Sequence, residues 1–207
     1  MTYGTMQDRI ADELARADLT SNIRKAIQSA IRHYERKAFY FNETRSTLST
    51  SDGAEYYTTS DFPFIDKMAE IYSARILVGT NRYTLMERDW DYIESLNSSS
   101  SYRGDPIDFS YYGKQLRFSP VPNAARDIIM SYVEKAATLS ATTDTNYWMT
   151  DGEELIRCRA VRKLYAEVIK DAENATIWAG HEMEALQSLL SETEARTMTG
   201  APRPTYF

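Results

Sequence analysis

The side chains that could do chemistry in this sequence are few, and their spacing matches no complete catalytic or metal-binding pattern. The chain has two histidines, His33 and His181, and a single cysteine, Cys158. His181 and Glu182 begin the H-E-x-x-H pattern of zinc proteases, but Ala185 stands where the second histidine ligand belongs. We therefore interpret His181 as a partly buried histidine on a helix.

Other candidate sites are also incomplete. Asp105 and Asp108 flank Pro106 and could act as a carboxylate pair, but acidic residues are common at loop edges. The eight glycines form neither a dinucleotide-binding pattern nor a phosphate loop. Cys158 lies in an apolar helical stripe without a predictable base, which favours a small buried side chain over a nucleophile. The sequence therefore indicates a structural or interaction protein with no catalytic residue, cofactor or metal ion. A small hydrolase with an unrecognised site is an alternative.

The composition is that of an ordinary globular protein with an acidic charge balance. Of the 207 residues, 43% are hydrophobic and 26% are charged, and the formal net charge is -6. This balance argues against a protein that grips nucleic acid by its phosphates, although nucleic acid could still pass nearby. No apolar run approaches the roughly 18 residues of a membrane span, and residues 1–10 lack the apolar core of a signal peptide. We therefore expect no membrane partner and a reducing cytoplasm as the place of assembly.

The longest helical pattern runs from Thr150 to about Arg196. Thr150 and Glu153 have the spacing of a capping box, which predicts that a helix begins there. A weak break at 171–174 predicts a second helix, which Asn174 could cap. On this second helix we expect Glu182 to lie mostly in water. The apolar stripe of the first helix contains Leu155, Cys158, Val161, Tyr165 and Val168, and that of the second contains Ile177, Trp178, His181 and Leu189.

Two amphipathic helices are expected near the N-terminus, at about 5–17 and about 20–38. The stripe of the second helix contains Ile23, Ile27, Ala30, Ile31, Tyr34 and Ala38. Its outer face is basic and contains Arg24, Lys25, Arg32, His33, Arg36 and Lys37. We interpret this face as a solvated surface that complements acidic helices near the C-terminus, so that helices from both chain ends pack together.

The middle of the chain changes to a strand-like pattern. The turn Asp52-Gly53 predicts a first hairpin between 43–51 and 54–60, and alternation around Gly113 predicts a second. Residues 68–78 alternate as a strand does, although a helix stays open as an alternative. Residues 87–96 predict a short amphipathic helix.

These patterns predict an α+β fold. It consists of a helical bundle formed by the N- and C-terminal helices, a β-rich insertion in the middle and an extended C-terminal arm. The expected boundaries are 1–38 for the N-terminal helices, 39–142 for the insertion with its helix near 87–96, 143–197 for the C-terminal helices and 198–207 for the arm. Two prolines favour an extended arm, and Tyr206 and Phe207 end it. Such rings have no core of their own, so we expect either a frayed terminus or anchors in a neighbouring subunit.

Four segments carry a resemblance to a known family. They are DRIADELARADLTSNIRKAIQSAIRHYERKAFYFNE (8–43), LRFSPVPNAARDIIMSYV (116–133), TDTNYWMTDGEELIRCRAVRKLYAEVIKD (143–171) and RPTYF (203–207). Together they resemble the head–tail adaptor (connector) proteins of tailed bacteriophages. Each segment is less specific than a metal-binding motif, but their order and spacing extend over nearly the whole chain.

The resemblance implies a structural virion protein that forms a ring, usually of twelve copies, beneath the portal and extends the DNA channel. Its implied partners are the portal protein, further copies of the chain and the next tail component, a nozzle or stopper. Arg203, Pro204, Tyr206 and Phe207 match the terminal pattern of the family, so the resemblance implies that they contact the portal. It also implies a location at the head–tail interface of the virion, after assembly in the host cytoplasm. A neighbouring tail component, such as a stopper or tail terminator, is the alternative.

Double-stranded DNA would pass through such a channel without specific binding. Each Lys or Arg that meets a phosphate adds sequence-independent attraction, so we expect an acidic or neutral channel lining. Candidates for this lining are the last helix and the loops near Asp105 and Asp108. The basic face of the second helix is expected to meet other protein.

Overall fold

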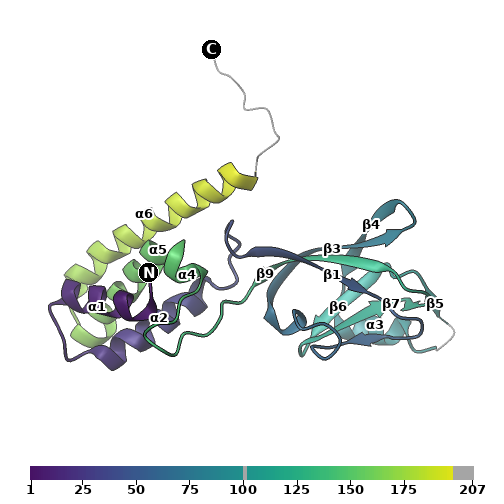
Figure 1. The fold of residues 1–207 in the computed structure, drawn as a ribbon, viewed down its shortest axis with the longest axis horizontal. Coiled ribbons are helices and arrows are strands. Elements are labelled where there is room, and N and C mark those ends of the chain that lie inside the picture. The colour runs from purple at the N-terminus through teal and green to yellow at the C-terminus, as the bar shows by residue number, and fades with distance from the viewer. Residues whose placement is uncertain (100–101, 198–207) are drawn as a thin grey trace, which may run out of the picture. The chain divides into compact units, whose positions relative to one another are not determined.

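The computed structural model of the protein describes residues 1–99 and 102–197. The chain divides into two compact units. The helical unit combines residues 1–42 with the segment that begins at Ala136, and the β unit is formed by residues 43–135. Figure 1 shows helices gathered in the first unit and strands in the second. The four segment boundaries expected from the sequence describe a finer division, which stays a prediction.

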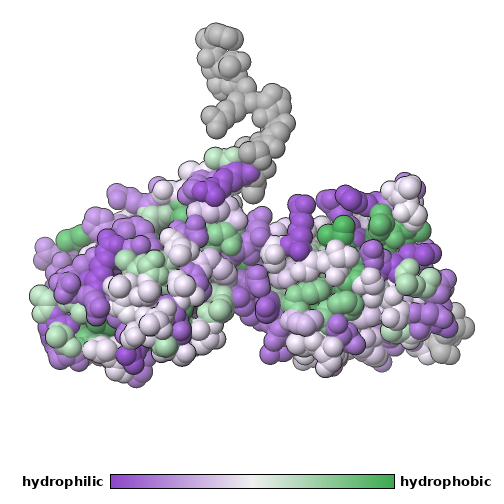
Figure 2. Space-filling view, in the orientation of Figure 1, coloured by the Kyte–Doolittle hydropathy of each residue, from purple (hydrophilic) through white to green (hydrophobic). Residues whose placement is uncertain are grey.

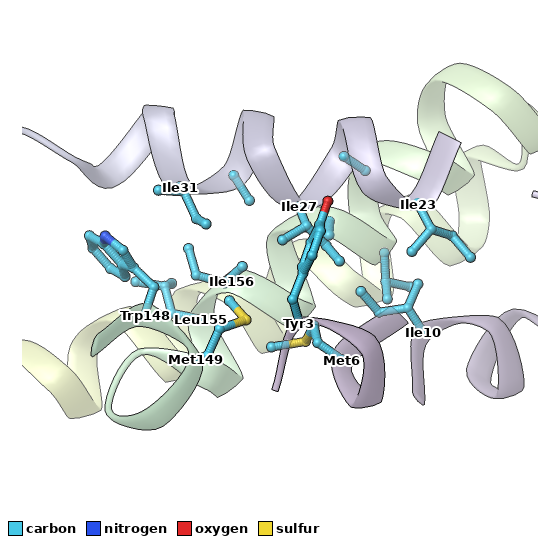
Figure 3. Close-up of a cluster of buried hydrophobic side chains, with 14 of the residues drawn as sticks. Tyr3, Met6, Ile10, Ile23, Ile27, Ile31, Trp148, Met149, Leu155 and Ile156 are labelled. Carbon is cyan, nitrogen blue, oxygen red and sulfur yellow. The ribbon is translucent and has the colours of Figure 1, made fainter. Parts of the chain in front are cut away.

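The helices of the helical unit follow the apolar spacing of the sequence. They are α1 (Tyr3–Leu14), α2 (Thr20–Tyr34), α4 (Tyr147–Thr150), α5 (Glu153–Leu164), the π-helical turn η2 (Tyr165–Ile169) and α6 (Ala172–Thr197). Side chains of α1, α2, α4 and α5 meet in one core, where Ile27, Trp148 and Ile156 are fully buried (Figure 3). The predicted stripe of α2 is confirmed from Ile23 to Tyr34, because its apolar members are buried over that length.

The predicted capping box at Thr150 is wrong. Thr150 is the last residue of α4, which Asn146 caps by accepting from Trp148 N at 3.0 Å and Met149 N at 3.3 Å. The following helix, α5, begins after Gly152 without a side-chain cap. A Cβ atom at Gly152 would lie 2.5 Å from Cε3 of Trp148. The close approach of this backbone to the indole ring therefore requires glycine.

The break between the last two helices lies where the sequence indicates, but a different residue caps α6. Lys170 adopts a left-handed conformation (φ 61°) and ends the π-helical turn. Asp171, not Asn174, then caps α6, because Asp171 Oδ1 accepts from Asn174 N at 3.0 Å. The carboxylate satisfies a backbone donor at the start of the helix, and this bond lowers the pKa of Asp171.

The predicted fold class is wrong, because the helices of the two termini do not form a bundle. The chain is mixed α/β with a large seven-stranded sheet. In a bundle, α6 would bury a continuous stripe, yet its buried described residues are Glu182, Leu189 and Thr193. Its other core-facing apolar residues, Trp178, Ala185, Leu186 and Leu190, are only partly buried. Ile177, which the stripe placed in the core, is 52% exposed. The β-rich middle of the predicted fold is present in the structure.

The described residues of the β unit form nine strands, one 3-10 turn and one short helix. The strands are β1 (Glu43–Ser49), β2 (Tyr56–Tyr57), β3 (Met68–Val78), β4 (Asn81–Glu87), β5 (Arg103–Gly104), β6 (Asp108–Tyr112), β7 (Gln115–Ser119), β8 (Val121–Pro122) and β9 (Asp127–Glu134). The 3-10 turn is η1 (Ile65–Lys67), and the helix is α3 (Trp90–Leu96). The large sheet has the order β1-β9-β3-β4-β6-β7-β2, and β5 pairs with β8.

Strand pairing confirms one predicted hairpin and contradicts the other. β6 and β7 pair on either side of Gly113 and Lys114, whose positive φ angles (58° and 63°) suit a tight turn. The Asp52-Gly53 turn does not join a hairpin, because β1 pairs with β9 and β2 pairs with β7. Residues 68–78 form a strand, so the helical alternative for this segment is excluded.

The core of the β unit lies on one face of the curled sheet. Ala74 and Ile76 of β3 contribute to the same apolar cluster as Phe109 of β6 and Phe118 of β7. The two ends of the sheet therefore close on one core, and successive residues on each strand point alternately into it and away from it. Figure 2 shows that hydrophobic residues also reach the surface of this unit, beside hydrophilic ones.

Candidate functional site

The described residues contain no assembled chemical centre. No group of three or more His, Cys, Asp and Glu side chains among them could hold a metal ion. Over the same ranges, no helix is long and apolar enough to cross a membrane. Cys158 is buried, and burial together with the Glu154 carboxylate raises the pKa of its thiol to about 12. This thiol stays protonated near neutral pH and is a poor nucleophile.

The two aspartates considered as a carboxylate pair are each bound to a different arginine. Asp105 Oδ1 accepts from Arg126 Nε at 2.7 Å, and Asp108 Oδ1 accepts from Arg88 Nε at 3.1 Å. Each charge is balanced by its own partner, so this geometry does not support a catalytic pair. The side chain of His181 is 53% exposed, so its predicted place in the apolar stripe of α6 is wrong.

A buried ionic network joins three helices of the helical unit. Glu182 of α6 is 4% exposed, although the sequence placed it in water. Its carboxylate accepts from the Tyr34 hydroxyl at 2.5 Å, from Arg159 Nη1 at 2.9 Å and from Arg162 Nη1 at 2.8 Å. Tyr34 lies on α2, and both arginines lie on α5. The carboxylate therefore fixes α6 to two other helices.

The electrostatics of this network favour the ionised carboxylate. Burial alone raises the pKa of Glu182, but the hydrogen bonds from Tyr34, Arg162 and Arg159 lower it below its ordinary value. Burial and the bond to Glu182 raise the pKa of Tyr34, so this hydroxyl remains a donor. The sequence gives one signal for the network, the pair of arginines three residues apart on α5, but it does not show which carboxylate they meet.

The C-terminal end of α6 is held by Tyr40 and its neighbours. The guanidinium carbon of Arg196 lies 3.7 Å from the centre of the Tyr40 ring. Tyr40 N donates to Thr193 Oγ1 at 3.3 Å, and the Tyr40 hydroxyl donates to Asp151 Oδ1 at 3.1 Å. Leu189, one turn earlier, is buried in the core of the unit. The helix is thus fixed to the helical unit up to its last described turn.

The predicted contact residues Arg203, Pro204, Tyr206 and Phe207 lie outside the described residues. In the sequence they begin six residues after Thr197, the last residue of α6.

The basic face of α2 is largely exposed. Lys25 and Arg32 are seven residues apart on α2, which places them on one side of the helix, and Arg36 lies in the turn after the helix. None of the three forms an ion pair with a described residue. Arg24 differs, because its Nε donates to Gln7 Oε1 at 2.8 Å within the unit. Beside Arg32 lies a surface hollow of about 190 Å³, lined by residues of α2 and by residues 136–139.

An aromatic cluster surrounds a buried arginine beneath α3 of the β unit. The side chain of Arg117 is 3% exposed, and its guanidinium carbon lies 4.9 Å from the Tyr56 ring centre and 5.3 Å from that of Trp90. It forms ion pairs with Glu55 and Glu94. Burial alone lowers the pKa of Arg117, but the hydrogen bonds that it donates to Glu94 and Glu55 raise it. The charge is therefore retained, and it holds the exposed Tyr56 ring and the half-buried Trp90 ring, which sequence reasoning did not single out.

Comparison with known proteins gives the family of the chain. No curated protein matches it. The family model described as SU10 adaptor protein matches residues 1–204, which is almost the whole chain. This agrees with the predicted resemblance to phage head–tail adaptors and implies a virion component that meets portal and tail proteins. The chain therefore belongs to the SU10 adaptor protein family, whose members are structural adaptors.

Proposed function

We propose that this adaptor forms a ring of twelve copies beneath the portal, continues the DNA channel and offers the platform to which the next tail component attaches. The observation that carries the proposal is the family match over residues 1–204, which includes both units and most of the terminal segment. In this proposal the protein assembles in the host cytoplasm and remains at the head–tail interface of the virion.

The C-terminal segment is proposed as the portal contact, through Arg203, Pro204, Tyr206 and Phe207. This role is supported by the fixed end of α6, where Arg196 packs on Tyr40. A fixed starting point limits the directions that the following segment can take from the helical unit. Proline lowers the entropy lost when an extended segment binds, and aromatic rings supply anchors for a groove in the partner.

Deletion of residues 202–207 tests this role. Portal rings and adaptor are mixed, and bound adaptor is separated from free adaptor by sedimentation. We expect the deletion to abolish portal binding while the far-ultraviolet circular dichroism, which reports helix content, stays that of the full chain. Unchanged portal binding by the deleted chain would rule out the arm as the contact.

The channel lining is proposed to be acidic or neutral, with the basic face of α2 turned toward protein. The exposed charges of Lys25, Arg32 and Arg36 support this, because their attraction for phosphates would hinder DNA passage through a bore that they lined. A reconstruction of the ring that placed Arg24, Arg32 and Arg36 along the bore would contradict the assignment.

A further inference from the structure

We propose that adjacent copies in the ring join head to tail through two surfaces of the β unit, an arginine face and an acidic aromatic hollow. The arginine face consists of Arg45, Arg75 and Arg82. The hollow is lined by residues 87–90 and 110–112. The inference rests on the proposed ring and names the surfaces that would close it.

The arginine face is the outer side of β1, β9, β3 and β4. Arg75 lies between Ala74 and Ile76, which point into the core, so its own side chain points outward. Cross-strand pairing places Arg82 opposite Leu77, two residues from Arg75, and Arg45 opposite Ser131. All three arginines are exposed, and none has an ion-pair partner within residues 1–99 and 102–197. Their charges are available to another molecule.

The hollow has the chemistry to receive a guanidinium group. Its volume is about 510 Å³, and the Trp90 and Tyr112 rings lie 5.8 Å apart between their centres. Tyr112 is 69% exposed. The carboxylates of Glu87 and Asp89 form no ion pair with any residue that the structure describes. Arginine stacks on aromatic faces and binds carboxylates through parallel donors, so this lining suits it better than an apolar group.

Glu87 and Asp89 of this hollow are not neutralised by an ion pair with a described residue of the unit. Arg88 also lines the hollow, but its guanidinium is held by Asp108 and lies over the Tyr92 ring. Partial burial and the Glu70 carboxylate raise the pKa of Glu87, so its negative charge is held at a cost in free energy. A cation from another molecule would relieve this cost.

The two surfaces face away from each other. α3 packs on β6 and β7 over Ser110 and Arg117, whereas Phe109 and Phe118 on the same strands point into the core. The arginines stand on the opposite side of that same core, beyond Ala74 and Ile76. Figure 1 agrees, with β3 and β1 along the upper side of the unit and α3 on the lower side. Complementary surfaces on opposite sides of one unit are what a closed head-to-tail ring requires.

A charge-reversal experiment tests the pairing. Variant one carries Arg75→Glu and Arg82→Glu, and variant two carries Glu87→Arg and Asp89→Arg. Each is added to portal rings alone, and the two are then added as an equal mixture, with the number of bound copies counted by native mass spectrometry. The pair Arg75→Lys and Arg82→Lys keeps the charge and is the matched control. All altered side chains are exposed, and thermal unfolding confirms that each variant folds.

We expect each reversed variant alone to need about tenfold more protein to complete the ring. The lysine control keeps the charge but loses the stacking and the parallel donors of arginine, so we expect it to fall between wild type and the reversed variants. The mixture should restore ring formation, because copies that alternate around an even-numbered ring place opposite charges at each interface. Unchanged ring formation by either variant alone, or no rescue in the mixture, overturns this inference while leaving the proposed ring standing. Failure of the wild-type chain to form a ring on the portal overturns the proposed function and this inference with it.

Discussion

Replacing Glu182 by glutamine tests whether the buried network holds α6 in place. The glutamine keeps the shape of the side chain but removes the negative charge of the carboxylate. That carboxylate accepts three hydrogen bonds, from Tyr34, Arg159 and Arg162. The amide nitrogen of the glutamine is a donor, so at least one guanidinium N–H loses its acceptor. The buried network therefore loses its charge-assisted hydrogen bonds, and its donors no longer match its acceptors.

The expected loss follows from the exposure of the partners. Removing one member of a buried ion pair costs about 3–5 kcal/mol. The Arg159 and Arg162 side chains are 26% and 42% exposed, so water can replace part of what each loses. We therefore expect Glu182→Gln to lower the free energy of unfolding by about 2–3 kcal/mol. The assay is urea-induced unfolding followed by far-ultraviolet circular dichroism.

The matched control is Glu167→Gln. Glu167 pairs with Lys163 at 2.9 Å, but the side chains are 60% and 35% exposed. An exposed pair of this kind contributes about 0–1 kcal/mol. If the two variants lost the same amount of stability, the reasoning that burial makes the Glu182 network important would be refuted.

Three further outcomes follow from the structure. The folded pKa of Glu182 lies below the ordinary value of 4.5, so its contribution to stability is present above that pH and is lost as the pH falls below it. Unfolding free energies of the wild type and of Glu182→Gln should therefore converge in acid, and a constant difference down to full protonation would contradict this. Gly152→Ala should destabilise by about 1–3 kcal/mol, since its Cβ would meet Trp148. In contrast, Gly180→Ala, with no atom within 4 Å of the new Cβ, should stabilise α6 by about 0.5–1 kcal/mol; equal melting temperatures for the two variants would count against the packing argument. Cys158 should react with a thiol reagent only on unfolding, and rapid labelling of the native chain would contradict the burial of its thiol.

Local patterns in the sequence predict those elements whose partners are close in the chain. The stripe of α2 and the hairpin at Gly113 depend on spacing and turn chemistry within a few residues, and the structure confirms both. The Asp52-Gly53 hairpin fails because β1 finds its partner in β9, more than seventy residues later. The residues of a turn act only on their immediate neighbours. The pairing of β1 with β9 depends on a core whose residues are far apart in the sequence.

The same distinction explains the errors in the helical unit. Helical spacing identified where the last helices lie, but it could not show that α6 buries a carboxylate among its partly buried apolar residues. Glu182 is buried because Tyr34 and two arginines from other helices supply its hydrogen bonds, and no spacing within α6 encodes those partners. The aromatic cluster around Arg117 was missed for the same reason, since Tyr56 and Trp90 meet it from different elements.

The most direct test of the proposed role is a cryo-electron microscopy reconstruction, without imposed symmetry, of the full chain mixed with purified portal rings. The account predicts one ring of twelve adaptors on the tail-facing end of each portal, with the central channel continuous through both. Binding to tail tubes alone, with bare portals in the same sample, would contradict it and would favour a stopper or tail terminator.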